Sequence, residues 1–230
     1  MIYKDLESKA FTYWLRTGIK VDVESFVNKA EYKSLLQEID FFEETSKGII
    51  LFVGEGNFSF SLSLAKSSVN RKFFISSVFE SEKEISEEIK QNAEKLQEIG
   101  STVLYNIDGE KLDTYFKKLK FDRIIFNFPN TAIRDVKYGK TDNHYLLKNF
   151  LKSSASILKP NGKIIVSIVN TGYYKGMFDF ESLALQNYNK PNIYKFNPAR
   201  YKSYTHTMTH KNENGLEKYD DFISIVFILK

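Results

Sequence analysis

From residue 49 onward, short apolar runs alternate with longer amphipathic segments. The apolar runs are rich in Ile, Val and Phe, which is typical of buried strands. They are Ile49–Val53, Phe73–Phe79, Thr102–Ile107, Arg123–Asn127, Lys163–Val169, Ile193–Phe196 and Phe222–Leu229. The segments between the earlier strands predict helices at Phe60–Ser67, Glu82–Ile99, Gly109–Leu119 and Asn143–Leu158. Helix-ending signals follow two of them, at Gly100 and at Pro160-Asn161-Gly162.

This alternation predicts a three-layer α/β fold, in which a mostly parallel seven-stranded sheet has helices on both faces. No helical pattern separates the last two strands, so we expect the final strand to be antiparallel. Lys211-Asn212-Glu213-Asn214-Gly215 is typical of a hairpin tip. We expect two parts, a helical N-terminal cap over 1–46 and the α/β domain over 47–230. The cap is predicted from apolar residues at helical spacing, namely Phe26, Val27, Ala30, Leu35, Leu36, Ile39 and Phe42.

A glycine-containing turn follows the first strand. It reads Gly54-Glu55-Gly56-Asn57-Phe58 and runs directly into the first helix. Glycine allows a sharp turn and a close approach of the backbone to a ligand, and a helix start offers free N–H groups. Ser59 stands where dinucleotide sites have a third glycine, which disfavours a nicotinamide cofactor. The turn therefore predicts a nucleotide-like cofactor of another kind.

Polar residues also follow the next three strands. Glu80 is placed to accept hydrogen bonds from ribose hydroxyls, and Asp108 from an adenine amino group. The fourth strand runs into the polar turn Asn127-Phe128-Pro129. Taken singly, Glu80 and Asp108 are equally suited to capping the helices that follow them. Together, four successive strand ends favour a nucleoside-containing cofactor, and the set resembles Rossmann-like methyltransferases that use S-adenosylmethionine.

Several motifs closely resemble one family of such enzymes, the Rossmann-like uridine-N3 ribosomal RNA methyltransferases. Val53–Ser61 resembles the family signature V-G-E-G-D-F-S-F-S, and Phe121–Pro129 resembles F-D-R-I-V-F-N-F-P-H. Thr102–Asp108 is similar to T-V-L-H-x-V-D, and Tyr201–His206 is loosely similar to Y-P-G-Y-x-H. The resemblance covers roughly residues 47–210.

The resemblance implies an enzyme that methylates a base nitrogen of RNA, most simply uridine N3 of ribosomal RNA, with S-adenosylmethionine as cofactor. The implied cofactor residues are Gly54, Glu55, Gly56, Asn57 and Phe58, with Glu80 on the ribose and Asp108 on the adenine. The implied catalytic turn consists of Asn127, Phe128, Pro129 and Asn130. Residues expected near the substrate are Asn143, Tyr201, Tyr204 and His206.

The chain departs from the family at Asn130, where the family has histidine. An amide does not titrate near neutrality, so Asn130 cannot act as a general base. The candidates for that role are His144, Asp135, Asp142 and His206. Two interpretations stay open for the turn. In the functional interpretation, Phe128 stacks on a target base and Asn127 binds that base. In the structural interpretation, Phe128 packs in the core and Asn127 ties the turn together.

Composition narrows the classes of function. The 230 residues contain no cysteine and three histidines, which exclude thiolate sites and disfavour a histidine metal centre. No apolar run is long enough to span a membrane, so we expect a cytoplasmic protein without metal or membrane partners. No feature indicates an oligomeric state.

Charge is divided unevenly along the chain. Residues 1–130 carry 18 Lys and Arg against 21 Asp and Glu, whereas residues 131–230 carry 15 against 8. The second part also interleaves tyrosine with lysine, an arrangement that suits RNA, although such tyrosines equally suit cross-strand packing. Two other functions are compatible with the sequence: methylation of a small molecule or protein, and a non-catalytic module that binds RNA or a partner through residues 170–211.

Overall fold

A seven-stranded sheet forms the centre of the computed structural model, which describes residues 37–131, 133, 136–137, 140–180, 183, 185–208 and 211–230. The strand order is β3-β2-β1-β4-β7-β11-β8. The strands are β1 (Ile50–Phe52), β2 (Phe74–Ser77), β3 (Thr102–Leu104), β4 (Phe121–Asn127), β7 (Leu158–Val169), β8 (Asn192–Lys195) and β11 (Phe222–Ile228). Each predicted strand is therefore confirmed to within a few residues.

The strand directions agree with the prediction. The pairs β1–β2, β1–β4, β2–β3 and β4–β7 are parallel, whereas β11 runs antiparallel to both β7 and β8. The first four crossovers therefore place the carboxyl ends of β3, β2, β1, β4 and β7 along one edge of the sheet.

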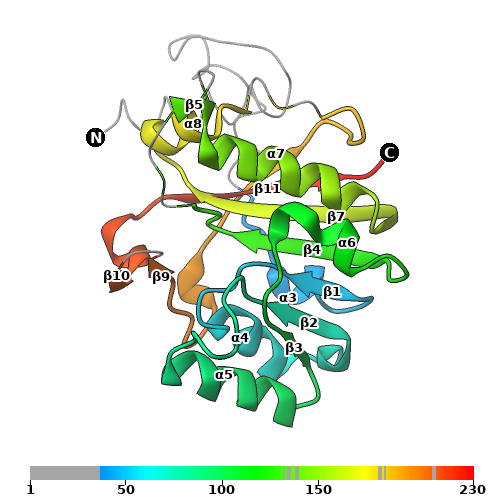
Figure 1. The fold of residues 1–230 in the computed structure, drawn as a ribbon, viewed down its shortest axis with the longest axis vertical. Helices are drawn as coiled ribbons and strands as arrows, with labels where there is room; N and C mark the ends of the chain where they lie inside the picture. Colours follow the sequence, from blue (N-terminus) through cyan, green and yellow to red (C-terminus); the bar gives the residue numbers. More distant parts are fainter. Residues whose placement is uncertain are drawn as a thin grey trace.

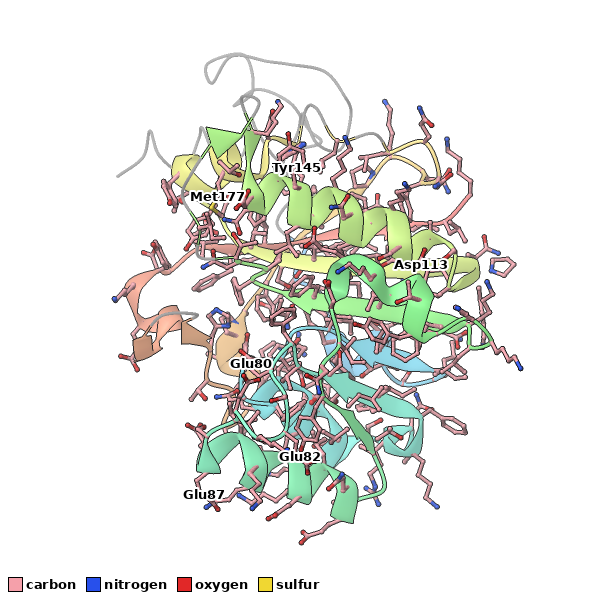
Figure 2. All side chains as sticks on the ribbon, viewed as in Figure 1. Glu80, Glu82, Glu87, Asp113, Tyr145 and Met177 are labelled. Carbon is pink, nitrogen blue, oxygen red and sulfur yellow. The ribbon has the colours of Figure 1, made fainter. Side chains whose placement is uncertain are left out.

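Helices cover both faces of the sheet (Figure 1). One face carries α3 (Phe41–Glu44), α4 (Ser59–Ser67) and α5 (Glu87–Glu98), and the other carries α6 (Leu112–Tyr115), α7 (Asp142–Ala155) and α8 (Gly172–Phe178). Short 3₁₀ turns are η2 (Arg71–Phe73), η3 (Gly109–Lys111), η5 (Pro198–Arg200) and η6 (Gly215–Lys218). Figure 2 shows Tyr145 of α7 and Met177 of α8 near one another.

Each face has its own apolar core. Phe60 and Leu64 of α4 and Leu96 of α5 pack on the first face, whereas Leu147 and Phe150 of α7 pack on the second. The two cores arise from the alternation along each strand, because successive side chains point to opposite faces. In β4, for example, Ile124 and Phe126 belong to one core and Ile125 to the other.

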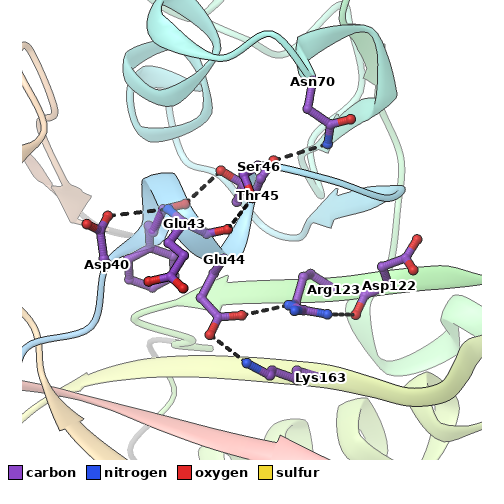
Figure 3. Close-up of polar contacts among 10 residues, drawn as sticks. Asp40, Glu43, Glu44, Thr45, Ser46, Asn70, Asp122, Arg123 and Lys163 are labelled. Carbon is purple, nitrogen blue, oxygen red and sulfur yellow. Dashed lines mark hydrogen bonds and ion pairs between the residues drawn. The ribbon is translucent and has the colours of Figure 1, made fainter.

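The segment before β1 is anchored at the amino end of the sheet. The Glu44 carboxylate of α3 forms ion pairs with Arg123 Nε (2.7 Å) and Lys163 Nζ (2.6 Å) (Figure 3). In the same region, Asn70 Nδ2 donates to the Thr45 carbonyl at 3.1 Å. Phe41 is fully buried. The predicted N-terminal cap lies mostly outside the described residues, and the part that is described packs on the α/β core.

Two local predictions were wrong. Pro160-Asn161-Gly162 does not end a helix but lies inside β7, where a register shift opposite Phe121 to Arg123 marks a bulge. Asn161 has φ 60° there, and a side chain on Gly162 would meet the Lys159 carbonyl oxygen at 2.8 Å. Turn-forming residues in this case form an irregular strand end rather than a loop.

The second correction concerns residues 211–215. Lys211–Asn214 is strand β10, which pairs antiparallel with β9 (Thr207–Met208), so most of the predicted tip is a strand. Other elements were also missed, among them α8 and the two short paired strands β5 (Val136–Lys137) and β6 (Lys140–Thr141). The predicted helix over Gly109–Leu119 is split into η3 and α6.

Candidate cofactor and substrate site

Backbone hydrogen bonds hold the predicted strand ends side by side at the carboxyl edge. The Glu55 N–H donates to the Ser77 carbonyl (2.9 Å), the Asn106 N–H to the Glu80 carbonyl (3.0 Å), the Ile107 N–H to the Val78 carbonyl (3.0 Å) and the Phe128 N–H to the Ser167 carbonyl (2.8 Å). The loops after β1, β2 and β3 therefore adjoin one another, and the last bond joins the turn after β4 to β7. The loop after β1 begins beside β4, because the Val53 N–H donates to the Ile125 carbonyl at 2.8 Å. The residues that the sequence grouped on chemical grounds come from one edge of one sheet.

The glycine turn requires its first glycine. Gly54 has φ 61°, and a Cβ at this position would stand 2.6 Å from Cε2 of the Phe126 ring. The turn ends at Phe58, which also has a positive φ of 58° and is fully buried. The backbone at Gly54 thus packs directly against the Phe126 ring of β4, with no side chain between them.

The side chains of Glu55 and Asn57 bind the start of α4. Asn57 Oδ1 accepts from the Ser59 N–H at 3.1 Å, and Glu55 Oε1 accepts from the Ser61 N–H at 3.1 Å. Glu55 Oε2 also accepts from the Ser61 hydroxyl. Burial disfavours the charged carboxylate and raises the pKa of Glu55 to about 7, although the bonds from Ser61 act in the opposite direction. Both residues therefore shape the turn through their side chains.

Thr205 fastens a distant segment onto this turn. The Ser59 hydroxyl donates to the Thr205 carbonyl (2.8 Å), the Thr205 N–H donates to the Ser59 hydroxyl oxygen (3.0 Å), and Asn57 Nδ2 donates to Thr205 Oγ1 (2.8 Å). These bonds bring Tyr204 and His206 to the first motif. The loosely similar motif over 201–206 and the specific motif over 53–61 consequently form one site.

A small, partly open cavity lies between these two segments. Its volume is about 20 Å³, which suits a single water molecule, and its lining includes Gly54, Glu55, Asn127, Tyr204 and His206. The Asn127 side-chain oxygen is buried without a hydrogen-bond partner. An acceptor left in this state is unusual and marks a place where a donor from a ligand fits.

Two titratable rings border the cavity. Burial lowers the pKa of His206 to about 4, so its imidazole is neutral at physiological pH. Burial, reinforced by the Glu55 carboxylate, raises the pKa of Tyr204 well above its ordinary range. Both rings are therefore uncharged, and the cavity offers polar contacts without a fixed positive charge.

The turn after β4 is held by packing and by α7. Phe128 has φ 54°, and its ring lies 4.7 Å from the His206 ring and 5.6 Å from the Phe222 ring, between centroids. Asn143, which is fully buried, accepts from the Thr131 N–H through Oδ1 at 2.8 Å. This arrangement agrees with the packing interpretation of Phe128 and gives Asn143 a positioning role. Pro129 and Asn130 belong to the same turn. Pro129 is buried, and Asn130 is half-buried.

The two acidic residues differ in their surroundings. Asp108 caps η3 by accepting from the Glu110 N–H (2.9 Å), and its other oxygen pairs with Lys111 Nζ at 2.8 Å. Glu80 is exposed (Figure 2) and does not cap α5, whose N-cap is Ser86. The Glu80 carbonyl accepts from the Asn106 N–H, which joins the loops that carry the two acidic residues, but neither residue lines the small cavity. The capping interpretation thus applies to Asp108 and fails for Glu80.

Among the candidate bases, His206 lines the cavity beside Asn127. His144 is buried on α7, where its Nδ1 lies 2.8 Å from the Phe178 carbonyl oxygen and links α7 to the end of α8. Asp142 begins α7, and Asp135 lies outside the described residues. Tyr201 is buried, and its hydroxyl oxygen accepts from the Phe41 N–H at 3.2 Å, a contact that secures α3.

Sequence reasoning missed Thr205, Ser59 and Phe79. Thr205 and Ser59 carry no chemical signal, and their contact spans 146 positions. Phe79 is 67% exposed immediately before Glu80. The sequence shows a phenylalanine beside a carboxylate at a strand end, but only the structure shows that its ring is exposed.

The described residues contain neither a candidate metal-binding cluster nor a membrane-spanning helix. Within the described ranges, no group of three or more His, Asp or Glu side chains is arranged to hold a metal ion. None of the helices that the structure describes combines the length and apolar character needed to cross a bilayer.

Comparison with protein families gave one match that covers most of the chain. The model described as BMT5-like, rRNA (uridine-N3-)-methyltransferase BTM5-like, matches residues 51–208. The matched region contains the glycine turn, both acidic residues, the turn after β4 and the segment that Thr205 fastens.

Relatives and solved structures extend this comparison. The Uncharacterized protein At4g26485 of Arabidopsis thaliana is 26% identical over 76% of this chain and 87% of its own length. Ferredoxin-fold anticodon-binding domain-containing protein 1 of Homo sapiens is 29% identical over 52% of this chain, but the match spans only 19% of that protein.

Two solved structures share the fold. The N-methyltransferase NodS of Bradyrhizobium japonicum WM9 has a TM-score of 0.51 at 11% identity, with 81% of this chain and 90% of that chain covered. NSun6 of Pyrococcus horikoshii, solved with SFG, has a TM-score of 0.52 at 12% identity, with 82% and 49% covered. At these identities the likeness concerns the fold, which confirms the predicted Rossmann-like methyltransferase architecture.

Proposed function

The chain belongs to the BMT5-like rRNA (uridine-N3-)-methyltransferase family, and we propose that it transfers the methyl group of S-adenosylmethionine to a base nitrogen of RNA. The observation that carries the proposal is the buried, unpartnered oxygen of Asn127 beside the glycine turn. It places a hydrogen-bond acceptor where β4 ends, next to the loops that suit a nucleoside.

The edge residues fit S-adenosylmethionine chemically. Gly54 has to be glycine because a methyl group there would collide with Phe126. Neither Gly54 nor Gly56 presents a side chain, so a ligand could approach the backbone of the turn closely. Glu80 and Asp108 follow the neighbouring strands and supply carboxylate acceptors for ribose hydroxyls and an adenine amino group. When bound, S-adenosylmethionine supplies an electrophilic methyl group. The exposed Phe79 ring adds an apolar surface beside Glu80.

The residues after β4 act on the target base by positioning it. Asn127 would orient the base by accepting a hydrogen bond through its buried oxygen, while Phe128 and Asn143 keep the turn in place. In uridine the donor of that bond is N3–H, whose proton must leave as the methyl group is transferred, and neutral His206 in the same cavity is the candidate that would take it. Methyl transfer is an in-line displacement, so alignment of the nucleophilic nitrogen with the methyl group dominates the acceleration, and positioning supplies as much as about 7–11 kcal/mol in favourable systems. Uridine N3 of ribosomal RNA is the target that family membership supports.

The direct test is to incubate the protein with labelled S-adenosylmethionine and total RNA, and then to identify modified nucleosides by mass spectrometry. We expect label in a methylated pyrimidine, 3-methyluridine if the family target holds. Protein with Asn127 replaced by Ala serves as the control. Label recovered in protein or small molecules and not in RNA would favour the rival substrate classes.

Asp108 provides a separate test of cofactor binding. Asp108→Ala removes both the cap of η3 and the proposed adenine acceptor, whereas Asp108→Asn keeps a capping oxygen but loses the second carboxylate oxygen. We expect both variants to weaken S-adenosylmethionine binding about tenfold by calorimetry, with only the Ala variant about 1 kcal/mol less stable. Unchanged affinity in the Asn variant would limit Asp108 to its capping role.

A further inference from the structure

An open groove lies next to the small cavity, and Tyr204 lines both. The groove has a volume of about 560 Å³, and it is lined by residues 195–199 and 201–204 together with Glu217, Asp220 and Phe222. The cavity beside Asn127 holds only about 20 Å³. Tyr204 therefore borders both the Asn127 cavity and a space within the usual range of about 300–1,000 Å³ for small-ligand sites.

The groove is built against the turn that follows β4. Its aromatic residues Phe196 and Phe222 pack on Phe128, with ring centroids 5.9 Å and 5.6 Å apart. The Phe196 ring also lies 6.5 Å from the Tyr204 ring. A ligand in the groove would thus contact the same aromatic group that supports Asn127 and its neighbours.

The groove carries charged residues of both signs. Lys195 and Lys202 are exposed on the segment that runs from the end of β8 to Tyr204, and Glu217 and Asp220 are exposed on the segment that runs from η6 to β11. Lysines suit phosphate oxygens, and aromatic rings suit the faces of unstacked bases. Carboxylates accept hydrogen bonds from ribose hydroxyls or base amino groups while repelling phosphate. Together these residues suit one nucleotide, with its phosphate toward the lysines.

We propose that this groove receives one unstacked nucleotide of the RNA substrate, and that the Tyr204 ring positions its base next to Asn127. The proposal rests on the proposed function, since it identifies how an RNA substrate reaches that site. A duplex does not fit the requirement, because a paired base cannot leave its stack to enter a groove of this size without being flipped out.

Photo-crosslinking tests the proposal without requiring methyl transfer. Single-stranded RNA containing 4-thiouridine is bound to the full chain, irradiated and mapped by mass spectrometry. We expect cross-links within residues 195–204 and 217–222. Cross-links confined to other parts of the chain, with RNA bound, would overturn the groove but leave the proposed function intact. Absence of RNA binding would overturn both.

A groove-filling substitution gives an independent readout. Ala199 is exposed and lines the groove, so Ala199→Trp introduces a large side chain there. The matched control is Ser67→Trp, an exposed position at the end of α4. We expect Ala199→Trp to raise KM for RNA at least tenfold, and to reduce the 195–204 cross-links equally, while calorimetric affinity for S-adenosylmethionine stays within twofold. Equal RNA kinetics and cross-link yields in the two variants would contradict the proposal.

Discussion

Asn127 keeps its side-chain oxygen buried without a partner. A buried acceptor that no donor satisfies costs about 1–3 kcal/mol in a folded protein, so the Asn127 oxygen calls for a donor from a water or a ligand in the adjoining cavity. A purely structural asparagine that ties a turn together would use this oxygen. The arrangement is therefore the opposite of the structural interpretation that the sequence left open, and it agrees with a site that a ligand completes.

Asn127→Ala should consequently lower methyl transfer far more than cofactor affinity. We expect kcat to fall about a hundredfold, because losing the contact that orients a reactant has effects of this size. S-adenosylmethionine affinity should change less than about threefold, and the melting temperature should stay constant or rise because the unsatisfied oxygen is gone. Equal losses in kcat and cofactor affinity, accompanied by lower stability, would assign Asn127 a structural role.

Glu55 joins two properties that normally exclude each other. It accepts two hydrogen bonds from Ser61 at the start of α4, where negative charge is favoured, but burial raises its pKa from the usual value of 4.5 to about 7. The folded state therefore holds the Glu55 proton more tightly than the unfolded chain does.

The pH dependence of stability follows from this shift. The contribution of Glu55 is complete below about pH 4.5 and is lost as the pH rises toward about 7. Glu55→Gln cannot titrate, so the difference in free energy of unfolding between wild type and variant should change between pH 5 and pH 8. The wild type should become less stable relative to the variant as the pH rises. Urea unfolding at several pH values measures this. His206, whose pKa is lowered to about 4, is common to both proteins and cancels in the difference.

Among the elements, the loops at the carboxyl edge contain several residues in left-handed conformations. Phe58 follows β1, Asn106 follows β3 and Phe128 follows β4, all with positive φ. Non-glycine residues adopt this conformation at a cost, and such positions persist when surrounding contacts dictate them, often at functional sites. The strain coincides with the edge where the strand ends adjoin.

Ser203 is a further residue of this kind, with φ 66°. It precedes the segment that Thr205 fastens and stands where the resembled motif Y-P-G-Y-x-H has glycine. Ser203→Gly should raise the free energy of unfolding by up to about 1 kcal/mol, because glycine adopts this φ without a steric penalty. Lys202→Gly, at a neighbouring position without positive φ, should be destabilising. Denaturant unfolding of both variants distinguishes relief of strain from a general effect of glycine.

At the scale of the whole molecule, the amino and carboxyl edges of the sheet, where the parallel strands begin and end, have different roles. The amino edge carries structural ion pairs, such as those of Glu44 with Arg123 and Lys163. The carboxyl edge carries the positive-φ residues Phe58, Asn106 and Phe128, the unpartnered Asn127 oxygen and the groove. This separation lets the site vary without disturbing the contacts that secure the sheet.

The charge of the second part of the chain should determine how RNA binding responds to salt. Residues 131–230 carry 15 Lys and Arg against 8 Asp and Glu. Binding through phosphate contacts releases counterions, so RNA affinity should fall at least tenfold between about 50 and 200 mM salt. Fluorescence anisotropy measures the slope, and S-adenosylmethionine affinity provides a control that should change little. A flat RNA response would argue against phosphate contacts by this part of the chain.

Much of the fold was predictable because it follows from local patterns. Short apolar runs between amphipathic segments defined the strands. The polar residues at strand ends fell at one edge because parallel strands with helical crossovers point the same way. The errors occurred where local signals have two solutions. Pro160-Asn161-Gly162 suits both a turn and a bulge, and only its pairing opposite β4 selects the bulge.

The sequence by itself determined the order of the strands along the chain, the family and the residues at the carboxyl edge, since these depend on near neighbours. Tertiary structure alone decided which distant segments meet. The contact of Thr205 with Ser59, the contact of Asn143 with Thr131 and the placing of Tyr204 between cavity and groove depend on packing against a completed sheet. A chain pattern records what each residue prefers to bury, but not which of many equally suitable partners closes over it.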